Sequence, residues 1–379
     1  MNSNKMRIGV LLSFAGALLA YLIGSGTASG QESIQYFSSW GSVSGTLTVA
    51  IVNFIIMFCA FMAYTYAGRH GTTDLAGVCE FYCGKTVGRL FTAFAWIFNA
   101  CSFFFMISGF GNALNQQWGI PVWIGYAAAV VLAVGTAILG LQGIVNIIGK
   151  IGPVVVSFLF LLGVIASVTY FSRIPKGIEL IQSGQVQVLQ AGANPILAGV
   201  SFGGCSILLV AAYMSSIGKE LSGYKSKYST VICLIGAGAI SVTVCILGLC
   251  HLGNIADSST AAIPNLLIAN TIFGSASGIF GTVFAIVILL SIYSTFCPML
   301  WTCVSTFIKN EKSAKYKFAC VIAGLVVFVV DMFIPYATLV NIIMTYCGYT
   351  GGVVFAVITI RWIMVKIKDK KAAVKTSTS

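Results

Sequence analysis

The residues that could bind a solute gather in the first apolar segment of the chain, in a stretch rich in glycine. This stretch, Ile23–Glu32, reads Ile-Gly-Ser-Gly-Thr-Ala-Ser-Gly-Gln-Glu. Its three glycines disfavour a helix interior, because glycine loses the most backbone entropy on ordering. Where a membrane helix is interrupted, the free amides of one half attract an anion and the free carbonyls of the other attract a cation. We therefore predict a broken helix whose amides around Ser25–Thr27 bind an anionic group of a solute.

Two charged side chains could serve the same site. Glu32 is the one carboxylate well inside an apolar segment. Burying it without a partner would cost several kcal/mol, so it should face water, pair with a cation or be protonated. It could attract a cationic group of the solute, act as an outer gate or carry a coupled proton; the alternative is a hydrated carboxylate in a vestibule. Lys150 begins the fifth apolar segment and either anchors it at the membrane surface or reaches toward the first helix, where its ammonium would replace a metal cation.

A second glycine-rich stretch, Gly199–Ser206, lies inside another apolar segment. It predicts a second broken helix, with Phe202 as the ring that could close over a bound solute. The alternative is a glycine face that packs closely against a neighbouring helix, which is common in membranes.

Three hydroxyl groups of the eighth apolar segment share one helix face. Ser291, Ser294 and Thr295 have the spacing i, i+3 and i+4. Hydroxyl oxygens are suitable ligands for a small alkali cation, and carbonyls of a broken helix could complete the coordination. The alternative is that these hydroxyls bond back to carbonyls of their own helix.

The sequence contains no constellation typical of an enzyme, and we expect none of its chemistry to be catalytic. His70 and His251 are predicted near opposite membrane faces. Cys79 and Cys83 with His70 form the only arguable metal cluster, and their spacing fits no zinc pattern. The twelve cysteines are scattered through apolar segments, as expected for small buried side chains rather than disulfides.

Composition places these residues in a multi-span membrane protein, because 58% of the residues are hydrophobic and only 8% are charged. Apolar runs near the roughly 20 residues that a bilayer requires predict ten transmembrane helices. These runs are 8–37, 44–68, 88–113, 121–140, 148–171, 192–218, 228–252, 274–308, 316–333 and 336–365.

The basic residues predict the orientation of these helices. The net charge is +12, and every Lys and Arg except Arg173 and Lys176 falls on the side of the two termini. The positive-inside rule therefore places both termini in the cytoplasm. The basic excess then reflects topology, and no nucleic-acid partner is expected.

The ten helices divide into two halves of five. Residues 1–191 and 192–366 form the two repeats of one all-α membrane domain, and residues 367–379 form a short basic cytoplasmic tail that we expect to be disordered. Because five is odd, the two halves have inverted orientations. Broken helices at corresponding positions, here helices 1 and 6, indicate the binding site of a transporter.

This layout resembles the amino acid–polyamine–organocation (APC) superfamily and its leucine-transporter-type fold. Ile23–Gly26 looks like the Gly-Ser-Gly motif of amino acid permeases, whose amides bind the substrate carboxylate. The chain looks most similar to bacterial YkvI-type membrane proteins, which implies the bacterial cytoplasmic membrane as its location. Together with Glu32, the resemblance implies that the substrate is bound by Gly24, Ser25, Gly26, Thr27, Ser201, Phe202 and Gly203.

The resemblance also implies a sodium site. It would be formed by the carbonyls of Ala20 and Ile23 and by Ser291, Ser294 and Thr295. Lys150 lies roughly where sodium-independent permeases carry a lysine in place of this ion.

We therefore expect a symporter of a small zwitterionic solute, an amino acid or a related amine, that works by alternating access and is coupled to a cation, with Na⁺ as the first expectation. Its partners are the solute and the lipid bilayer, with no cofactor beyond the coupling ion; the chain could be a monomer or a homo-oligomer. The lack of an acidic residue within Gly24–Gly30 disfavours a bare amine, although Glu32 reopens that option. The alternatives are a proton-coupled or exchange permease that uses Lys150 and Glu32, and a sensor or channel with the same fold.

Overall fold

The computed structural model describes residues 11, 14, 18, 25–138, 152–272, 277–308 and 310–378. Within these ranges the chain consists of helices and turns, with no strand. The long helices are α3 (Val43–Arg69), α4 (Leu75–Trp118), α5 (Val122–Ile138), α7 (Gly152–Tyr170), α9 (Pro195–Glu220), α10 (Ser226–Gly253), α13 (Ser277–Ser305), α14 (Ala314–Asp331) and α15 (Tyr336–Thr378). The short elements are α2 (Ser25–Ser29), α8 (Ile174–Gln182), α11 (Ile255–Ser258), α12 (Pro264–Thr271), a π-helix η1 (Ser33–Phe37) and the 3₁₀ turns η2 (Ser38–Trp40), η3 (Phe171–Arg173) and η4 (Leu221–Gly223).

Several helices begin where a side chain can accept the first free amides. The Ser42 hydroxyl accepts from the Gly45 amide at 3.0 Å at the start of α3, and the Asp74 carboxylate accepts from the Gly77 amide at 2.7 Å at the start of α4. Asn194 does the same for α9, whose first residue is Pro195. These are ordinary N-cap residues, so local sequence fixes where three membrane helices start.

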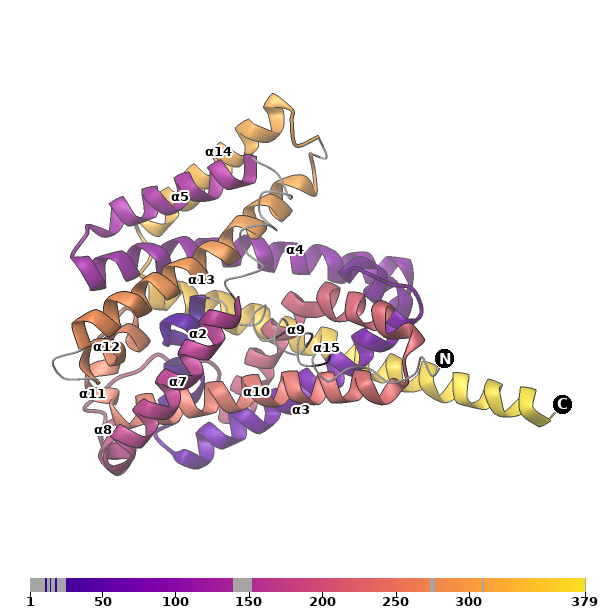
Figure 1. The fold of residues 1–379 in the computed structure, drawn as a ribbon, viewed down its shortest axis with the longest axis horizontal. Helices are drawn as coiled ribbons and strands as arrows, with labels where there is room; N and C mark the ends of the chain where they lie inside the picture. Colours follow the sequence, from indigo (N-terminus) through magenta and orange to yellow (C-terminus); the bar gives the residue numbers. More distant parts are fainter. Residues whose placement is uncertain are drawn as a thin grey trace.

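In the described part of the chain, seven helices are long and apolar enough to cross a membrane, and α5 is a shorter apolar helix. The prediction of an all-α membrane protein is confirmed at this level, whereas the count of ten crossings stays a prediction. Figure 1 shows α4 and α10 running along the long axis of the molecule, with α3 and α13 inclined to it. The short helices α8, α11 and α12 lie together at one end, and α5 and α14 form a layer beside α4.

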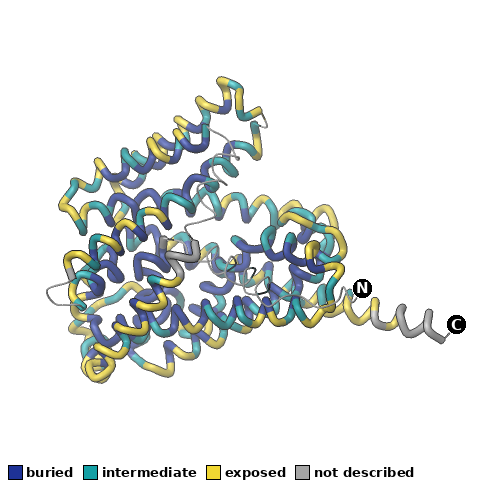
Figure 2. Tube along the Cα trace, viewed as in Figure 1, coloured by how far each residue is buried: buried dark blue, intermediate teal, exposed yellow. Residues whose placement is uncertain are grey.

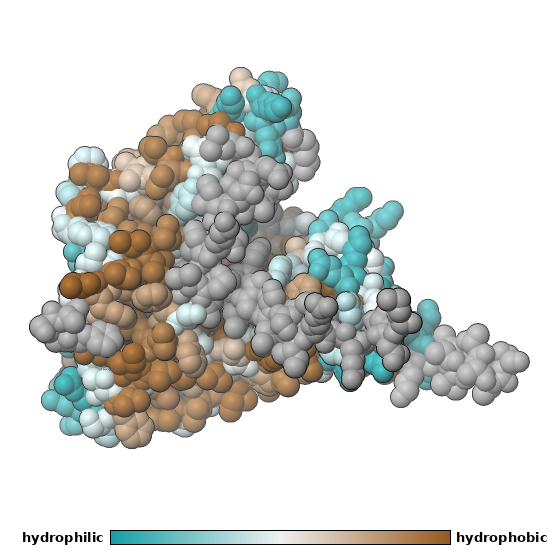
Figure 3. All heavy atoms as spheres, viewed as in Figure 1, coloured by the Kyte–Doolittle hydropathy of each residue, from teal (hydrophilic) through white to brown (hydrophobic). Residues whose placement is uncertain are grey.

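Among the described elements, the most extensive helix contacts are those that α9 makes with α3 and with α15. Among the helices long enough to cross a membrane, buried residues are most frequent in α9 and α10 and least frequent in α15. Figure 2 shows the buried residues gathered in the interior of the bundle. The outer faces carry exposed apolar side chains, among them Ile51 of α3 and Val131 of α5. Figure 3 shows a broad hydrophobic area on the visible surface, with hydrophilic residues toward the ends. An apolar surface of this extent is expected to contact lipid.

The predicted break of the sixth helix is wrong. α9 is one continuous α-helix from Pro195 to Glu220 and includes the whole of Gly199–Ser206. Its glycines let neighbouring backbones approach: a Cβ on Gly204 would overlap the Gly348 carbonyl oxygen of α15, and a Cβ on Gly199 would lie 3.1 Å from the Val49 carbonyl oxygen of α3. The glycine stretch is therefore a packing face, as small residues often are between membrane helices.

The described part of the first glycine-rich stretch departs from regular geometry at its last glycine. Ser25–Ser29 forms a helical turn, and the described backbone first leaves helical geometry at Gly30, with φ of 93°. The chain then continues through η1 and η2. A side chain at position 30 would be strained by this φ and would also meet Nε2 of His251 at 2.8 Å. Gly24, the first glycine of the stretch, lies outside the described residues.

The basic tail is more helical than expected. The tail that we expected to be disordered after residue 366 is a continuation of α15 to Thr378, and Figure 1 shows it projecting from the body of the molecule. Asp369 on this extension accepts a hydrogen bond from the Tyr66 hydroxyl of α3 at 2.5 Å, so α15 remains attached to the body beyond its apolar part. The polar segment after α3 contains the first turns of α4, up to a kink at Gly84.

Candidate functional site

A small pocket of about 30 Å³ lies in the interior of the helix bundle. Its wall contains residues of the first segment and of α4, α9, α10, α13 and α15. The lining residues are Thr27, Glu32, Phe98, Ser102, Phe105, Met106, Phe202, Ser206, Leu209, Ile240, Met299 and Met344. The structure thus brings Thr27, Glu32 and Phe202 together, although Phe202 is 170 residues away from Glu32 in the chain.

Glu32 folds back over the first glycine-rich stretch. It is only 6% exposed, and its carboxylate accepts a hydrogen bond from the hydroxyl of Thr27. A Cβ on Gly26 would overlap the Glu32 carboxylate, so glycine at this position is what allows the acid to lie there. The predicted anion-binding surface at Gly26 and Thr27 is therefore covered by an anionic group of the chain itself.

The carbonyls of the same stretch are held by a second group of side chains. Asn265 of α12 donates from Nδ2 to the carbonyls of Thr27 and Ala28, both at 3.0 Å. Its Oδ1 therefore faces Nε2 of His251 at 2.9 Å, and Nδ1 of His251 lies 3.1 Å from the Ser258 hydroxyl. These contacts are satisfied by a neutral imidazole with its proton on Nε2, which donates to Asn265, while Nδ1 accepts from Ser258.

Of the predicted residues on α9, only Phe202 lines the pocket. Its ring packs against Tyr36 and Phe37, with centroid separations of 5.2 and 5.3 Å. The Ser201 hydroxyl instead donates to the carbonyl of Thr345 in α15 at 3.0 Å. Gly203 faces α3, where a Cβ would meet Ile56 at 3.0 Å.

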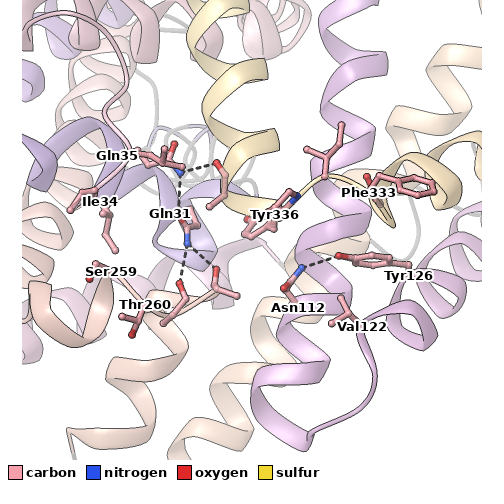
Figure 4. A pocket seen from close by; sticks show the side chains of 18 of the residues that line it. Gln31, Ile34, Gln35, Asn112, Val122, Tyr126, Ser259, Thr260, Phe333 and Tyr336 are labelled. Atoms are coloured by element: carbon pink, nitrogen blue, oxygen red, sulfur yellow. Dashed lines mark hydrogen bonds between the residues drawn. The ribbon is translucent and has the colours of Figure 1, made fainter. Parts of the chain in front are cut away.

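A second and larger cavity, of about 620 Å³, lies on the other side of the first segment. Gln31, Ile34 and Gln35 contribute to its wall, together with α4, α5, the segment before α12 and the turn between α14 and α15. Figure 4 shows these glutamines, with Tyr336 and the pair Asn112 and Tyr126, around this cavity.

Gln31, Gln35 and Tyr336 form a hydrogen-bonded layer between the cavity and the inner pocket. Gln31 donates from Nε2 to the carbonyls of Ala261 and Ala262, both at 3.1 Å, as Figure 4 shows. Gln35 donates to the Ala337 carbonyl at 3.0 Å, and the Tyr336 hydroxyl donates to Ser29 Oγ at 3.0 Å. Side chains of the first segment are therefore tied to the segment before α12 and to the start of α15 in this conformation.

The predicted sodium ligands are placed only in part. The hydroxyls of Ser294 and Thr295 donate to the Ser291 carbonyl at 2.7 and 3.0 Å, within their own helix. Ala20, Ile23 and Lys150 lie outside the described residues. The sodium site formed by these groups stays a prediction.

Most residues of the pocket wall were not predicted from the sequence. Phe98, Ser102 and Phe105 of α4 have the spacing i, i+4 and i+7 and line the pocket together, a signal that helical periodicity could have revealed. The adjacent Phe103 and Phe104 face a different, apolar groove beside α13 and α14. Met299 and Met344 carry no sequence signal that separates them from lipid-facing methionines.

Among the described residues, no group of three or more His, Cys, Asp or Glu side chains is arranged to hold a metal ion. The twelve cysteines are free thiols, and seven of them are buried.

No family model matches the chain. A curated relative, the uncharacterized protein YyaD of Bacillus subtilis (strain 168), is 26% identical over 225 residues, which are 59% of this chain and 62% of the relative. The chain thus matches less than two thirds of that relative's length. The resemblance to YkvI-type proteins stays a prediction.

Solved structures are similar over nearly the whole chain. MhsT in complex with L-phenylalanine has a TM-score of 0.57 at 14% identity, covering 95% of this chain and 88% of that one. Mhp1 in an inward-facing conformation has a TM-score of 0.57 at 14% identity, covering 94% and 77%. A variant of the manganese transporter of Eremococcus coleocola has a TM-score of 0.54 at 13% identity, covering 96% and 89%. The chain therefore has the leucine-transporter-type fold, and it is a multi-pass membrane protein.

Proposed function

We propose that the chain is a cation-coupled secondary active transporter that moves a small amino acid or a related zwitterionic amine across the bacterial cytoplasmic membrane by alternating access. The observation that carries this proposal is that the inner pocket and the larger cavity lie on either side of the first helical segment. The inner pocket contacts Thr27 and Glu32, and the larger cavity contacts Gln31 and Gln35. One segment thus separates a central site from one membrane side, as alternating access requires.

The pocket offers complementary contacts to a small amine. Glu32 supplies a carboxylate for an ammonium group, and Phe202 supplies an apolar face held by Tyr36 and Phe37. Gln31, Gln35 and Tyr336 would have to release their partners for a solute to enter from the larger cavity. Opening of this layer is the conformational step that we assign to solute entry, and such motions commonly set transport rates.

We further propose sodium as the coupling ion, bound by the hydroxyls of Ser294 and Thr295 beside the first helix. A hydroxyl that donates to the Ser291 carbonyl still has lone pairs that can face a cation, so the observed hydrogen bonds are compatible with this role. Binding of ion and solute to the same helix segment makes each ligand raise the affinity for the other.

Thr295→Ala tests the ion site. In proteoliposomes, the Na⁺ concentration for half-maximal solute uptake should rise about tenfold, equivalent to roughly 1.4 kcal/mol of binding free energy. Thr302→Ala on the same helix is the matched control and should leave the Na⁺ dependence unchanged. Equal Na⁺ activation in the Thr295→Ala protein and the wild type, at equal protein content, would remove Thr295 from the ion site.

Proton coupling is the second candidate, and the burial of Glu32 favours it. A carboxylate that is 6% exposed can take up a proton in one conformation and release it in another. Uptake driven by an imposed pH gradient in sodium-free proteoliposomes would support this mechanism over the sodium mechanism. A channel would show ion flux without saturable solute dependence.

A further inference from the structure

We propose that the inner pocket binds a small organic amine that carries no carboxylate beside its ammonium group, and that Glu32 provides the missing carboxylate from the protein. The inference rests on the proposed transport function and changes its substrate from a zwitterion to an amine without a carboxylate. Three features of the pocket carry it.

The first feature is the sign of the charge. Glu32 is the one ionisable side chain among the described residues that line the pocket. An ammonium group is attracted to this site, whereas a solute carboxylate would be brought close to Glu32 in a region of low dielectric constant, where like charges repel strongly. No cationic side chain in the described lining would compensate a second carboxylate.

The second feature is that the surface suited to an anion is already occupied. The Glu32 carboxylate covers Gly26 and accepts the hydrogen bond from the Thr27 hydroxyl. A solute carboxylate would have to displace Glu32 from both. The chain therefore positions its own acid where a zwitterion would place its carboxylate, and this leaves the amine as the part that the solute must contribute.

The third feature is an unused acceptor among aromatic rings. Ser102 is 1% exposed, and its hydroxyl has no hydrogen-bond partner among the described residues. It lines the same pocket as Glu32, together with the rings of Phe98, Phe105 and Phe202. A buried hydroxyl without a partner is costly, and an ammonium donor would satisfy it. Aromatic faces also attract a cation.

The size of the pocket agrees with this ligand. Its volume is about 30 Å³, close to the volume that one molecule occupies in liquid water. In the present conformation the pocket therefore holds one group of the size of an ammonium ion. The apolar remainder of an amine would extend toward the side chains of Met299 and Met344, which can adjust their shape because methionine is flexible.

Matched pairs of amino acids and their decarboxylation products test the inference. The probes are alanine and ethylamine, valine and isobutylamine, leucine and isoamylamine, and phenylalanine and phenethylamine, each added to the purified full-length protein at constant Na⁺. A ligand that binds the folded state raises the melting temperature by mass action. In at least one pair, we expect the amine to raise the melting temperature at a concentration at least tenfold lower than its amino acid requires.

Variants of the acid provide the second readout. Glu32→Gln keeps the shape and removes the charge, and it should raise the half-maximal amine concentration at least tenfold. Glu179→Gln makes the same change on the exposed face of α8 and should have no effect. Should Glu32→Gln fail to fold, Glu32→Asp keeps the charge on a shorter side chain and should retain the preference for amines.

The opposite results overturn the inference. Stronger stabilisation by the amino acids, or an amine response that Glu32→Gln leaves unchanged, would show that Glu32 is not the counter-charge. Sodium-driven uptake of an amino acid with no response to amines would uphold the proposed function and overturn this inference. Stabilisation by an amine that depends on Glu32, without uptake into proteoliposomes, would uphold the binding site and remove the transport function.

Discussion

At the scale of residues, two side chains fix the first segment from opposite sides. Glu32 accepts from the Thr27 hydroxyl on the pocket side, and Asn265 donates to the Thr27 carbonyl on the other side. Asn265 is itself held by His251. The position of Thr27 in the pocket therefore depends on a residue of α12 that does not line the pocket.

We predict that Asn265→Leu loosens this segment. The change leaves Nε2 of His251 without its buried acceptor, which costs about 1–3 kcal/mol. The melting temperature should fall, and backbone amides of residues 25–32 should exchange hydrogen faster. Asn115→Leu removes an exposed side-chain hydrogen bond, to the Ile120 carbonyl near the end of α4, and should not change exchange in residues 25–32. Unchanged exchange there in the Asn265→Leu protein would show that α12 does not support the segment.

Residue types revealed part of this site. Glu32 was identifiable as a lone carboxylate in an apolar segment, and Thr27 and Phe202 as members of glycine-rich stretches. The partners of these residues could not be identified in the same way. Asn265 lies in a segment that the sequence suggests only as a loop, and its contact with Thr27 joins positions more than 230 residues apart.

At the scale of elements, the glycines of α9 show that composition alone cannot distinguish a broken helix from a closely packed one. Low helix propensity predicts a break, but the same glycines also permit close packing, and the outcome depends on the partner helix. Gly204 meets Gly348 of α15, so the decisive information lies some 140 residues away. The starts of α3 and α9 were more predictable than this packing, because their N-cap residues act within three positions.

We predict that Gly204→Ala destabilises the protein. The added Cβ would overlap the backbone of Gly348, which cannot rotate away, and overpacking of this kind typically costs about 1–3 kcal/mol. Gly238→Ala is the matched control on α10, because the nearest atom to its new Cβ is Phe54 Cε2 at 3.9 Å. That variant should melt at the same or a higher temperature, because alanine favours a helix over glycine by about 1 kcal/mol. A Gly204→Ala protein as stable as the wild type would contradict the close packing of α9 on α15.

At the scale of the whole molecule, orientation decides what the larger cavity means. The cavity contacts residues 187–189 and 259–262, near the end where α8 and α11 lie. The distribution of basic residues predicts that this end is extracellular. The layer formed by Gln31, Gln35 and Tyr336 is then an outer gate in its closed form. With the opposite orientation, the same layer would be the cytoplasmic gate.

A pair of cysteine substitutions separates these cases. Ser183 and Ser222 are both exposed and flank α9, so a single membrane crossing lies between them. With cytoplasmic termini, Ser183→Cys should react with a membrane-impermeant maleimide in intact cells, and Ser222→Cys should react only after permeabilisation. The wild type gives the background of the native thiols, most of which are buried. The reverse pattern would show the opposite orientation in the membrane, and the closed layer would then be a cytoplasmic gate. Reaction of both positions in intact cells would contradict a single crossing by α9, and with it the assignment of the larger cavity to one membrane side of the transport path.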